Sequence, residues 1–290
     1  MSVSAQARKL SSDEHAVGRI VRGQAASDGA GVRLTRIIGQ PALPDLDPFL
    51  LLDEFRSDRA NDYIGGFPDH PHRGFETVTY LLAGRMRHRD SRGNSGLLRA
   101  GSVQWMTAGR GIVHSEMPEQ ENGLLWGFQL WVNLKASEKM TEPRYQDLDP
   151  EAIPTVQRAG GVTVKVIAGS FDGVVGPVRA SATDPSYFDI TLPAQQSLTH
   201  ALPREYCAFA YVFDGSVQIG PGLEPIERGE LAVLGTGNDI LVRAGPGQDA
   251  RLLLIAGKPL KEPIVRHGPF VMNSQAQIRQ ALEDFRTGQF

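Results

Sequence analysis

Short segments in which apolar and polar residues alternate recur along most of the chain, and glycine, proline or aspartate bounds most of them. Alternation combined with β-branched and aromatic residues, repeated about every dozen residues, is typical of strands in an all-β sandwich or barrel. Turn sequences such as Ala83-Gly84 and Asp214-Gly215 lie between these segments and predict hairpins. The predicted strands cover residues 31–38, 77–82, 86–90, 102–106, 124–134, 162–168, 187–192, 208–213, 216–219, 230–234, 239–244 and 251–256.

Only near the C-terminus are apolar residues spaced as in an amphipathic α-helix. Ser274, followed three residues later by Gln277, fits a capping box, and Gly288 ends the pattern. Four apolar residues between them are spaced as on one face of an amphipathic helix. These residues are Ile278, Ala281, Leu282 and Phe285. The pattern predicts one C-terminal α-helix that packs against an apolar surface.

The length of 290 residues predicts two domains of about 150 residues each. A polar, proline-containing stretch separates two strand-rich halves. We therefore expect an N-terminal domain over residues 1–135, a linker over 136–154 and a C-terminal domain over 155–290. The halves share an outline, because YLLAG at 80–84 resembles YVFDG at 211–215, each an apolar strand that runs into a glycine turn. This similarity favours a duplicated β-barrel.

The composition excludes several classes of protein. The chain has 30 Lys and Arg against 33 Asp and Glu, and this balance provides no basic surface for nucleic acid or anionic lipid. No run of about 18 apolar residues could span a membrane, and the N-terminus lacks the apolar core of a secretory signal. The single cysteine, Cys207, makes no internal disulfide and is interpreted as a small buried hydrophobe. We expect a cytoplasmic protein without membrane or direct nucleic-acid contact.

Two short histidine motifs are the most informative feature of the chain. His70 and His72 are two residues apart, so in an extended segment both rings share one face, about 6–7 Å apart at their Cα atoms. His114 and Glu116 repeat this spacing 42 residues after His72. A single H-x-H is also typical of half-buried histidines in a sheet, but the second pair makes that interpretation weaker. Two such strands side by side would bring three imidazoles and one carboxylate together.

This donor set favours a catalytic metal site. Imidazole and carboxylate are ligands for Fe, Mn, Co, Ni, Cu or Zn. Four protein ligands on an octahedral ion leave two positions for a substrate and for dioxygen or water. A closed structural zinc site would be tetrahedral and usually rich in cysteine, whereas this chain has a single cysteine.

Several longer blocks around these motifs carry a family resemblance. They are HPHRGFETVTY at 70–80, GSVQWMTAGRGIVHSE at 101–116, GFQLWVNL at 127–134 and GPFVMN at 268–273. Through them the chain resembles the pirin family of the cupin superfamily. The resemblance implies an all-β bicupin, in which two antiparallel jelly-roll β-barrel domains face each other and a C-terminal α-helix follows. It also implies that only the N-terminal barrel holds metal.

The resemblance assigns the metal ligands to His70, His72, His114 and Glu116. Fe(II) is the expected metal, and Mn, Co, Ni, Cu and Zn are alternatives. Glu76 has the parity of the first two histidines and stands where many cupins place a ligand, but the pirin pattern takes its carboxylate from Glu116.

Two other histidines are given structural roles. The C-terminal half has no H-x-H, so its His200 is interpreted as a structural histidine. His88 follows the first motif and is interpreted as a surface or barrel-lining residue.

Pirins include quercetin dioxygenases, so the resemblance implies a metal-dependent dioxygenase acting on a flavonol-like aromatic substrate and dioxygen. Such an enzyme cleaves the flavonol heterocycle and releases carbon monoxide. Glu116 is the expected catalytic base, which accepts the proton of the flavonol hydroxyl.

Two alternatives remain open. One is an iron-dependent, redox-responsive regulator that binds a protein partner, as a transcription cofactor (nuclear in a eukaryote) or as a modulator of a metabolic enzyme. The other is a different cupin chemistry, such as isomerisation without oxygen consumption.

Overall fold

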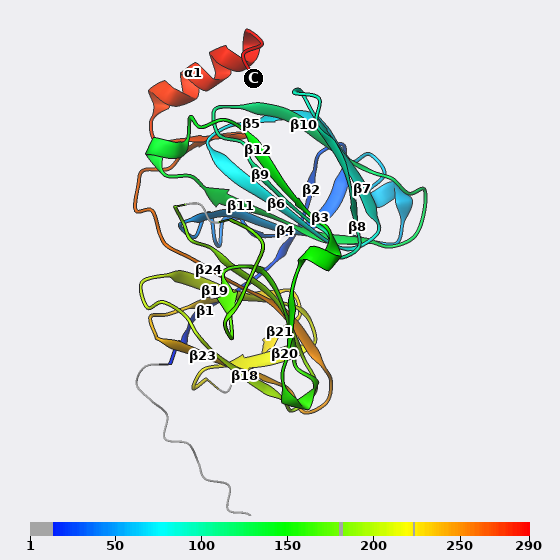
Figure 1. The fold of residues 1–290 in the computed structure, drawn as a ribbon, viewed down its shortest axis with the longest axis vertical. Coiled ribbons are helices and arrows are strands. Elements are labelled where there is room, and N and C mark those ends of the chain that lie inside the picture. Colours follow the sequence, from blue (N-terminus) through cyan, green and yellow to red (C-terminus); the bar gives the residue numbers. More distant parts are fainter. Residues whose placement is uncertain (1–13, 180–181, 223) are drawn as a thin grey trace, which may run out of the picture.

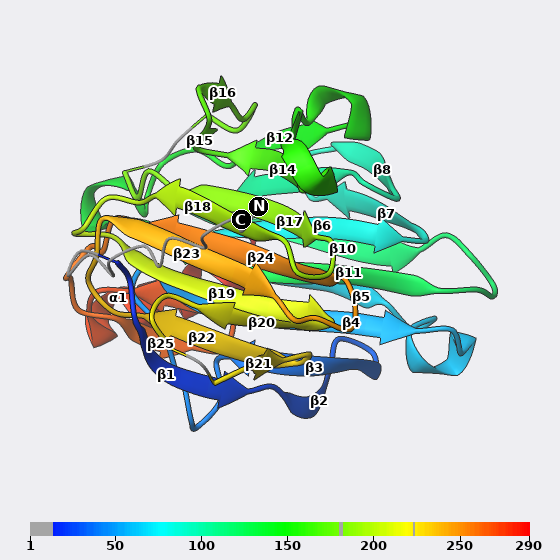
Figure 2. The same cartoon turned by 90° about the horizontal axis from the view of Figure 1, so that it is seen from below.

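Two seven-stranded antiparallel sheets pack face to face at the centre of the molecule (Figure 1). The computed structural model describes residues 14–179, 182–222 and 224–290. The buried side chains between the two sheets come from both halves of the chain and form one shared core. Seen from below, the strands of the second sheet lie over those of the first (Figure 2).

Each central sheet is one wall of a barrel, and a smaller four-stranded sheet forms the other wall. The first central sheet has the order β12(Arg144–Leu148), β9(Val103–Thr107), β6(Phe75–Ala83), β11(Leu125–Asn133), β4(Phe49–Ser57), β3(Val32–Ile38), β2(Gln24–Asp28). Its partner has the order β5(Phe67–His72), β10(Ile112–Pro118), β7(Arg85–Asp90), β8(Ser95–Arg99). The second central sheet has the order β1(Val17–Arg22), β22(Glu230–Leu234), β19(Cys207–Asp214), β24(Ala250–Gly257), β17(Ser186–Leu192), β14(Thr163–Ala168), β13(Thr155–Gln157). Its partner has the order β18(Ser197–Ala201), β23(Asp239–Ala244), β20(Ser216–Ile219), β21(Ile226–Glu227).

Smaller elements complete the fold. Two hairpins pair β15(Ser170–Phe171) with β16(Val174–Val175) and β25(Val265–His267) with β26(Phe270–Met272). The described helices are α1(Gln275–Arg286) and the short 3-10 turns η1(Ala60–Asp62), η2(Ala136–Glu138), η3(Pro150–Ala152) and η4(Ala159–Gly161).

All twelve predicted strands are present, and their ends differ from the predicted ends by at most two residues. The prediction of an all-β fold is therefore confirmed. The strand β4 is absent from the predicted set because its first seven residues, FLLLDEF, are all buried and do not alternate. Strand β1 is also absent from that set, since its polar sequence VGRIVR has no clear period.

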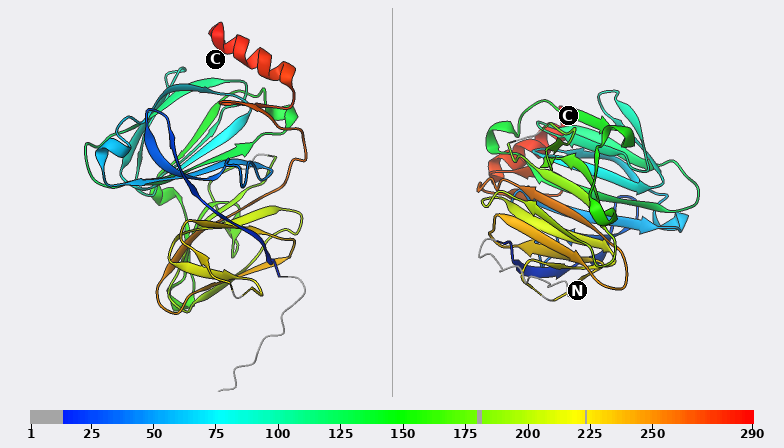
Figure 3. Two further views of the ribbon diagram at one scale, coloured as in Figure 1. Left: turned by 180° about the vertical axis from the view of Figure 1, so that it is seen from behind. Right: turned by 60° about the horizontal axis from the view of Figure 1, so that its bottom comes forward.

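Two strands cross the predicted domain boundaries. Strand β1 pairs antiparallel with β22, so residues 17–22 belong to the sheet of the second domain and their assignment to the first is corrected. The chain then crosses at Gly23 to the first domain, as the dark blue segment of Figure 3 shows. Strand β12 lies inside the predicted linker but pairs with β9 of the first domain. Residues 1–13, which include most of the stretch inspected for a secretory signal, lie outside the described residues.

The C-terminal helix α1 begins where the capping pattern predicts. Ser274 is its N-cap, and its hydroxyl accepts a hydrogen bond from the Gln277 amide at 3.3 Å. Ile278 and Ala281 are buried against β26. Only two of the four residues of the predicted apolar face are buried, because Leu282 and Phe285 are exposed. With 12 residues, α1 is too short to cross a membrane, and the described residues contain no longer apolar helix that could do so.

Two tyrosines connect the domains through reciprocal hydrogen bonds inside the shared core. The hydroxyl of Tyr80 on β6 donates to Asp189 on β17 at 2.7 Å. In the opposite direction, the hydroxyl of Tyr211 on β19 donates to Glu54 on β4. Both tyrosines begin the similar pentapeptides noted in the sequence, and each strand runs into a glycine with positive φ. The sequence repeat therefore marks matching positions of the two barrels.

We expect Tyr80→Phe to lower the free energy of unfolding by about 1–3 kcal/mol, because it leaves a buried carboxylate without one of its donors. Asp189 would keep only Arg251, whose guanidinium lies 2.9 Å away. Tyr187→Phe is the matched control, since its buried hydroxyl makes no hydrogen bond within the described residues. Urea unfolding of both variants provides the comparison. Equal losses in the two variants would show that the interdomain hydrogen bond does not stabilise the fold.

Candidate metal centre

Two neighbouring strands of the first domain carry the predicted histidine ligands. Strands β5 and β10 pair antiparallel, with His114 directly opposite His70 and Ile112 opposite His72. His72 shares a face with His70 because side chains two residues apart on a strand point the same way. The ring centroids are 4.4 Å apart for His70 and His114, 4.7 Å for His70 and His72, and 5.0 Å for His72 and His114. One ring nitrogen of each histidine lies within 4.8 Å of the other two.

Burial keeps two of these imidazoles neutral. His72 and His114 expose only 2% and 1% of their surface. Burial lowers the pKa of both rings well below the usual value, and the neighbouring imidazoles lower the pKa further. At neutral pH both rings are therefore uncharged, which is the form that offers a nitrogen lone pair to a metal.

Unpartnered ring nitrogens show that this cluster fits a metal ion. Within the described residues, His72 Nδ1 and both nitrogens of His114 are buried without a hydrogen-bond partner. Buried polar atoms are nearly always hydrogen-bonded, so these nitrogens need another partner. His70 Nδ1 lies 2.8 Å from the carbonyl oxygen of Pro68 and donates to it, which leaves Nε2 free as a ligand. A divalent transition metal suits three such nitrogens.

Glu116 lies beside the histidines but is held by two other side chains. The register of β10 against β5 shifts between His114 and Glu116, so a bulge separates the two residues. Oε1 of Glu116 accepts a hydrogen bond from the Thr79 hydroxyl at 2.7 Å, and Oε2 accepts one from Gln129 Nε2 at 3.0 Å. Its oxygens are not part of the 4.8 Å group formed by the three histidines. The carboxylate is 2% exposed and lines the same cavity as His70 and His72.

A cavity of about 370 Å³ opens beside this cluster, a size within the usual range for small-molecule sites. Its walls are mainly apolar, and its charged lining residues include Asp28, Asp53 and Arg266. The apolar wall consists of Leu34, Leu51, Phe55, Phe67, Pro68 and Trp131. The Trp131 ring stands edge-on to the His72 ring at 5.2 Å and packs on Phe75 at 4.3 Å. An aromatic ligand beside the histidines would therefore contact flat apolar surface.

Two family models match the chain: Pirin over residues 31–132 and the pirin C-terminal cupin domain over residues 187–290. A Pseudomonas aeruginosa protein named "Putative quercetin 2,3-dioxygenase" is 52% identical over 272 residues, covering 92% of this chain and 94% of that protein. The chain belongs to the pirin family.

Two further matches each cover more than nine-tenths of the chain. A pirin-like protein of Caulobacter vibrioides is 50% identical over 273 residues, covering 94% of this chain and 98% of that protein. The crystal structure of quercetin 2,3-dioxygenase from Acinetobacter baumannii matches with a TM-score of 0.87 and 32% identity, covering 96% of this chain and 98% of that chain. The bicupin fold that the pirin resemblance implies is confirmed.

In this pirin, Glu76 does not join the histidine cluster. Gly74, with φ of 88°, interrupts the strand between His72 and Glu76, so the parity argument does not extend past it. Glu76 accepts a hydrogen bond from the Thr107 hydroxyl at 2.6 Å. Val78, two residues further along β6, lies in the core between the domains. The alternative carboxylate therefore faces away from the cavity.

His88 is buried inside the first barrel of this pirin. It lies opposite Glu116 in the pairing of β7 with β10, and its ring stacks on Tyr145 at 5.5 Å. Its side chain is 1% exposed, so the structure agrees with a barrel-lining residue rather than a surface one.

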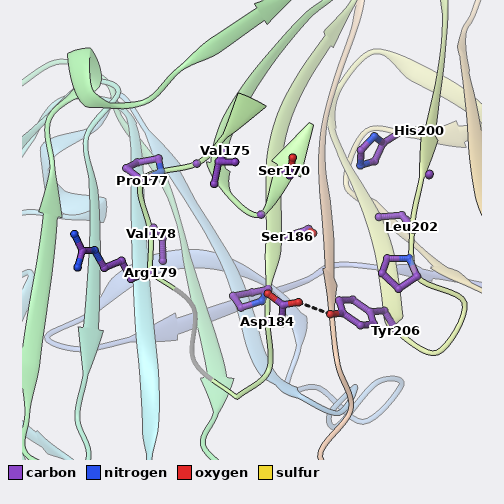
Figure 4. Close-up of a pocket in the computed structure, with 15 residues that line it drawn as sticks. Ser170, Val175, Pro177, Val178, Arg179, Asp184, Ser186, His200, Leu202 and Tyr206 are labelled. Atoms are coloured by element: carbon purple, nitrogen blue, oxygen red, sulfur yellow. Dashed lines mark hydrogen bonds between the residues drawn. The ribbon is translucent and has the colours of Figure 1, made fainter. Parts of the chain in front are cut away.

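The second barrel of this pirin contains a separate cavity of about 720 Å³ (Figure 4). His200 lines it, and its ring stacks on Phe171 at 4.4 Å. Burial lowers the pKa of His200 to about 4. Asp184 and Tyr206 are hydrogen-bonded to each other at another part of the wall. Among the described residues, only the cluster in the first barrel brings three potential metal ligands together.

Thr79, Gln129 and Trp131 are site residues that no motif in the sequence singled out. Thr79 and Gln129 lie opposite each other on β6 and β11, and both contact Glu116 at the cavity. Polar residues at inward-facing positions of predicted strands were the available signal. Which of them contacts Glu116 depends on strand pairing, which the sequence does not show.

Proposed function

We propose that this pirin is a metal-dependent dioxygenase that cleaves flavonols such as quercetin, using Fe(II) held by His70, His72, His114 and Glu116. The observation that carries the proposal is the convergence of three imidazoles, two of them buried and neutral, beside a mainly apolar cavity that His70 and His72 line. Relatives named for quercetin 2,3-dioxygenase support the same substrate class. The predicted cytoplasmic location stays a prediction.

The bound ion would supply Lewis acidity toward the hydroxyl and carbonyl oxygens of a flavonol and lower the pKa of that hydroxyl. The protein residues supply the rest. Glu116 accepts the proton of the 3-hydroxyl at a carboxylate oxygen, while Thr79 and Gln129 hold that carboxylate in place. The apolar walls around Trp131 pack against the aromatic rings and exclude water. The overall reaction consumes one dioxygen per flavonol and gives an aryl ester and carbon monoxide.

We expect Glu116→Gln to reduce flavonol turnover by about 10²-fold or more, because the amide cannot accept the hydroxyl proton. The variant keeps part of its metal, since the three histidines remain. Loss of quercetin absorbance measures turnover, and metal analysis of the same sample measures occupancy. Glu119→Gln is the control, because Glu119 pairs with Arg87 outside the cavity. A Glu116→Gln variant with full activity would rule out the role as base.

Oxygen dependence separates this proposal from the other cupin chemistries. The metal-loaded protein is expected to bleach quercetin in air and to stop when oxygen is removed. Turnover under argon would instead indicate an isomerase-type reaction. A metal-loaded protein that leaves quercetin unchanged in air would contradict the proposed function.

A further inference from the structure

Arg266 reaches the candidate catalytic cavity from a distant part of the chain. After β24 the chain runs from the second domain back to the first, where it forms the hairpin of β25 and β26 before α1 (Figure 1). Arg266 lies in β25 and lines the cavity, together with Gly268 and Pro269 of the hairpin turn. The hairpin therefore places a cation at a cavity built otherwise by the first domain.

Backbone contacts fix this hairpin beside the histidine cluster. The amide of Arg73, the residue after His72, donates to the Pro269 carbonyl at 3.3 Å, and the Val271 amide donates to the Arg73 carbonyl at 3.0 Å. Arg266 pairs with Val271 across the hairpin. The position of Arg266 is thus tied to the strand that carries His70 and His72.

One indole ring separates Arg266 from a candidate metal ligand. The guanidinium carbon of Arg266 lies 4.8 Å from the Trp131 ring centroid, and the same indole stands edge-on to His72. A flat ligand that is anchored at the histidines and lies along Trp131 would bring its far end to Arg266. A guanidinium stacked on an aromatic ring keeps its N–H edge free for an anion.

Two acidic residues that line the cavity with Arg266, Asp28 and Asp53, are already bound to another arginine. Arg36 donates to both oxygens of Asp53, at 2.9 and 2.7 Å, and to Asp28 at 2.8 Å. Arg266 itself contacts backbone carbonyls at long range, Leu50 at 3.4 Å and Gly268 at 3.5 Å. No carboxylate of the described residues forms an ion pair with Arg266, so the guanidinium N–H groups that do not contact these two carbonyls are available to a ligand.

We propose that Arg266 is a specificity-determining residue that selects substrates carrying a carboxylate or phenolate at the end remote from the metal-binding oxygens. This inference rests on the proposed function of the cavity and narrows its substrate class to anionic aromatic compounds.

Equilibrium binding under argon tests this selectivity without turnover. The probes are 3-hydroxyflavone and its 4′-carboxylate, added to the Fe(II)-loaded protein and followed by fluorescence. We expect the carboxylate to bind about 10-fold more tightly than the neutral probe, and added salt to reduce this preference. Arg266→Gln should weaken carboxylate binding about 10-fold while neutral binding changes less than about 2-fold. Arg266→Lys should restore part of the preference, and Arg286→Gln on α1 should leave it unchanged.

Two results would overturn the inference. If Arg266→Gln weakens the binding of both probes equally, Arg266 only packs on Trp131. If the binding of neither probe changes, Arg266 does not contact the ligand. Air admitted to the same samples then tests the proposed function separately. If the probes are turned over but the carboxylate is not preferred, only the proposed role of Arg266 is refuted. If the carboxylate is preferred but neither probe is turned over, only the proposed dioxygenase activity is refuted.

Discussion

His72→Ala is expected to lose most of its bound metal and, with it, the proposed flavonol turnover. His72 is buried and offers one of only three imidazole nitrogens that converge in the first barrel, so two ligands and Glu116 would remain. Changes to residues that merely orient metal ligands cost about 10–100-fold in affinity, and removal of a ligand should cost at least as much. We expect metal content after desalting to fall below about a tenth of the wild-type value.

Metal analysis and circular dichroism on the same preparation check this result. The fold should persist, because the barrel wall around His72 is held by strand pairing and by the core between the domains. His200→Ala removes a histidine from the second barrel and is expected to keep the metal. Wild-type metal stoichiometry in His72→Ala would defeat the assignment of the site.

Asp284→Asn is expected to lower the free energy of unfolding by about 3–5 kcal/mol, since it leaves a buried arginine without its counter-charge. Asp284 on α1 lies 2.7 Å from Arg73, whose side chain is only 4% exposed. The same guanidinium donates to the Arg110 carbonyl and lies 4.4 Å from the Phe290 ring. Arg73 follows His72 directly, so α1 helps to hold the segment that carries the candidate ligands. We also expect a metal affinity about 10-fold weaker in this variant.

Urea unfolding and metal titration measure both effects. Glu283→Gln is the control, because Glu283 pairs with Arg286 on the exposed side of α1 and its loss should cost no more than about 1 kcal/mol. The double variant Arg73→Met, Asp284→Leu should recover most of the stability, since no buried charge remains. An Asp284→Asn variant within 1 kcal/mol of the wild type would show that the ion pair does not stabilise this end of the molecule.

Local patterns predicted the elements of this fold well where one face of a strand is buried. Alternation marked strands such as β14 and β23, and the capping pair Ser274 and Gln277 marked the start of α1. The same signal failed for β4, which is buried on both faces, and for β1, which is stabilised by pairing with a strand more than 200 residues later. The pairing of β1 is a property of the assembled domains, so no local pattern shows it.

The sequence likewise predicted some residues of the candidate site and not others. The i, i+2 spacing singled out the histidines because side-chain direction on a strand follows sequence parity. The same parity made Glu76 an alternative ligand, but Gly74 breaks the strand before it and Glu76 does not join the histidines. Residues that reach the site from elsewhere, such as Gln129 and Arg266, depend on strand pairing and on the path of the C-terminal hairpin. Those long-range placements required the structure.

The proposed metal-dependent dioxygenase activity is tested by measuring oxygen uptake as a function of bound metal. Metal-free protein receives increasing Fe(II), and an oxygen electrode records uptake with quercetin at each metal content. We expect no oxygen uptake without metal, a linear rise with metal content, and saturation at one metal per chain, with one dioxygen consumed per flavonol. Full loading at one metal per chain without oxygen uptake, or uptake that does not depend on metal, would contradict the proposed activity.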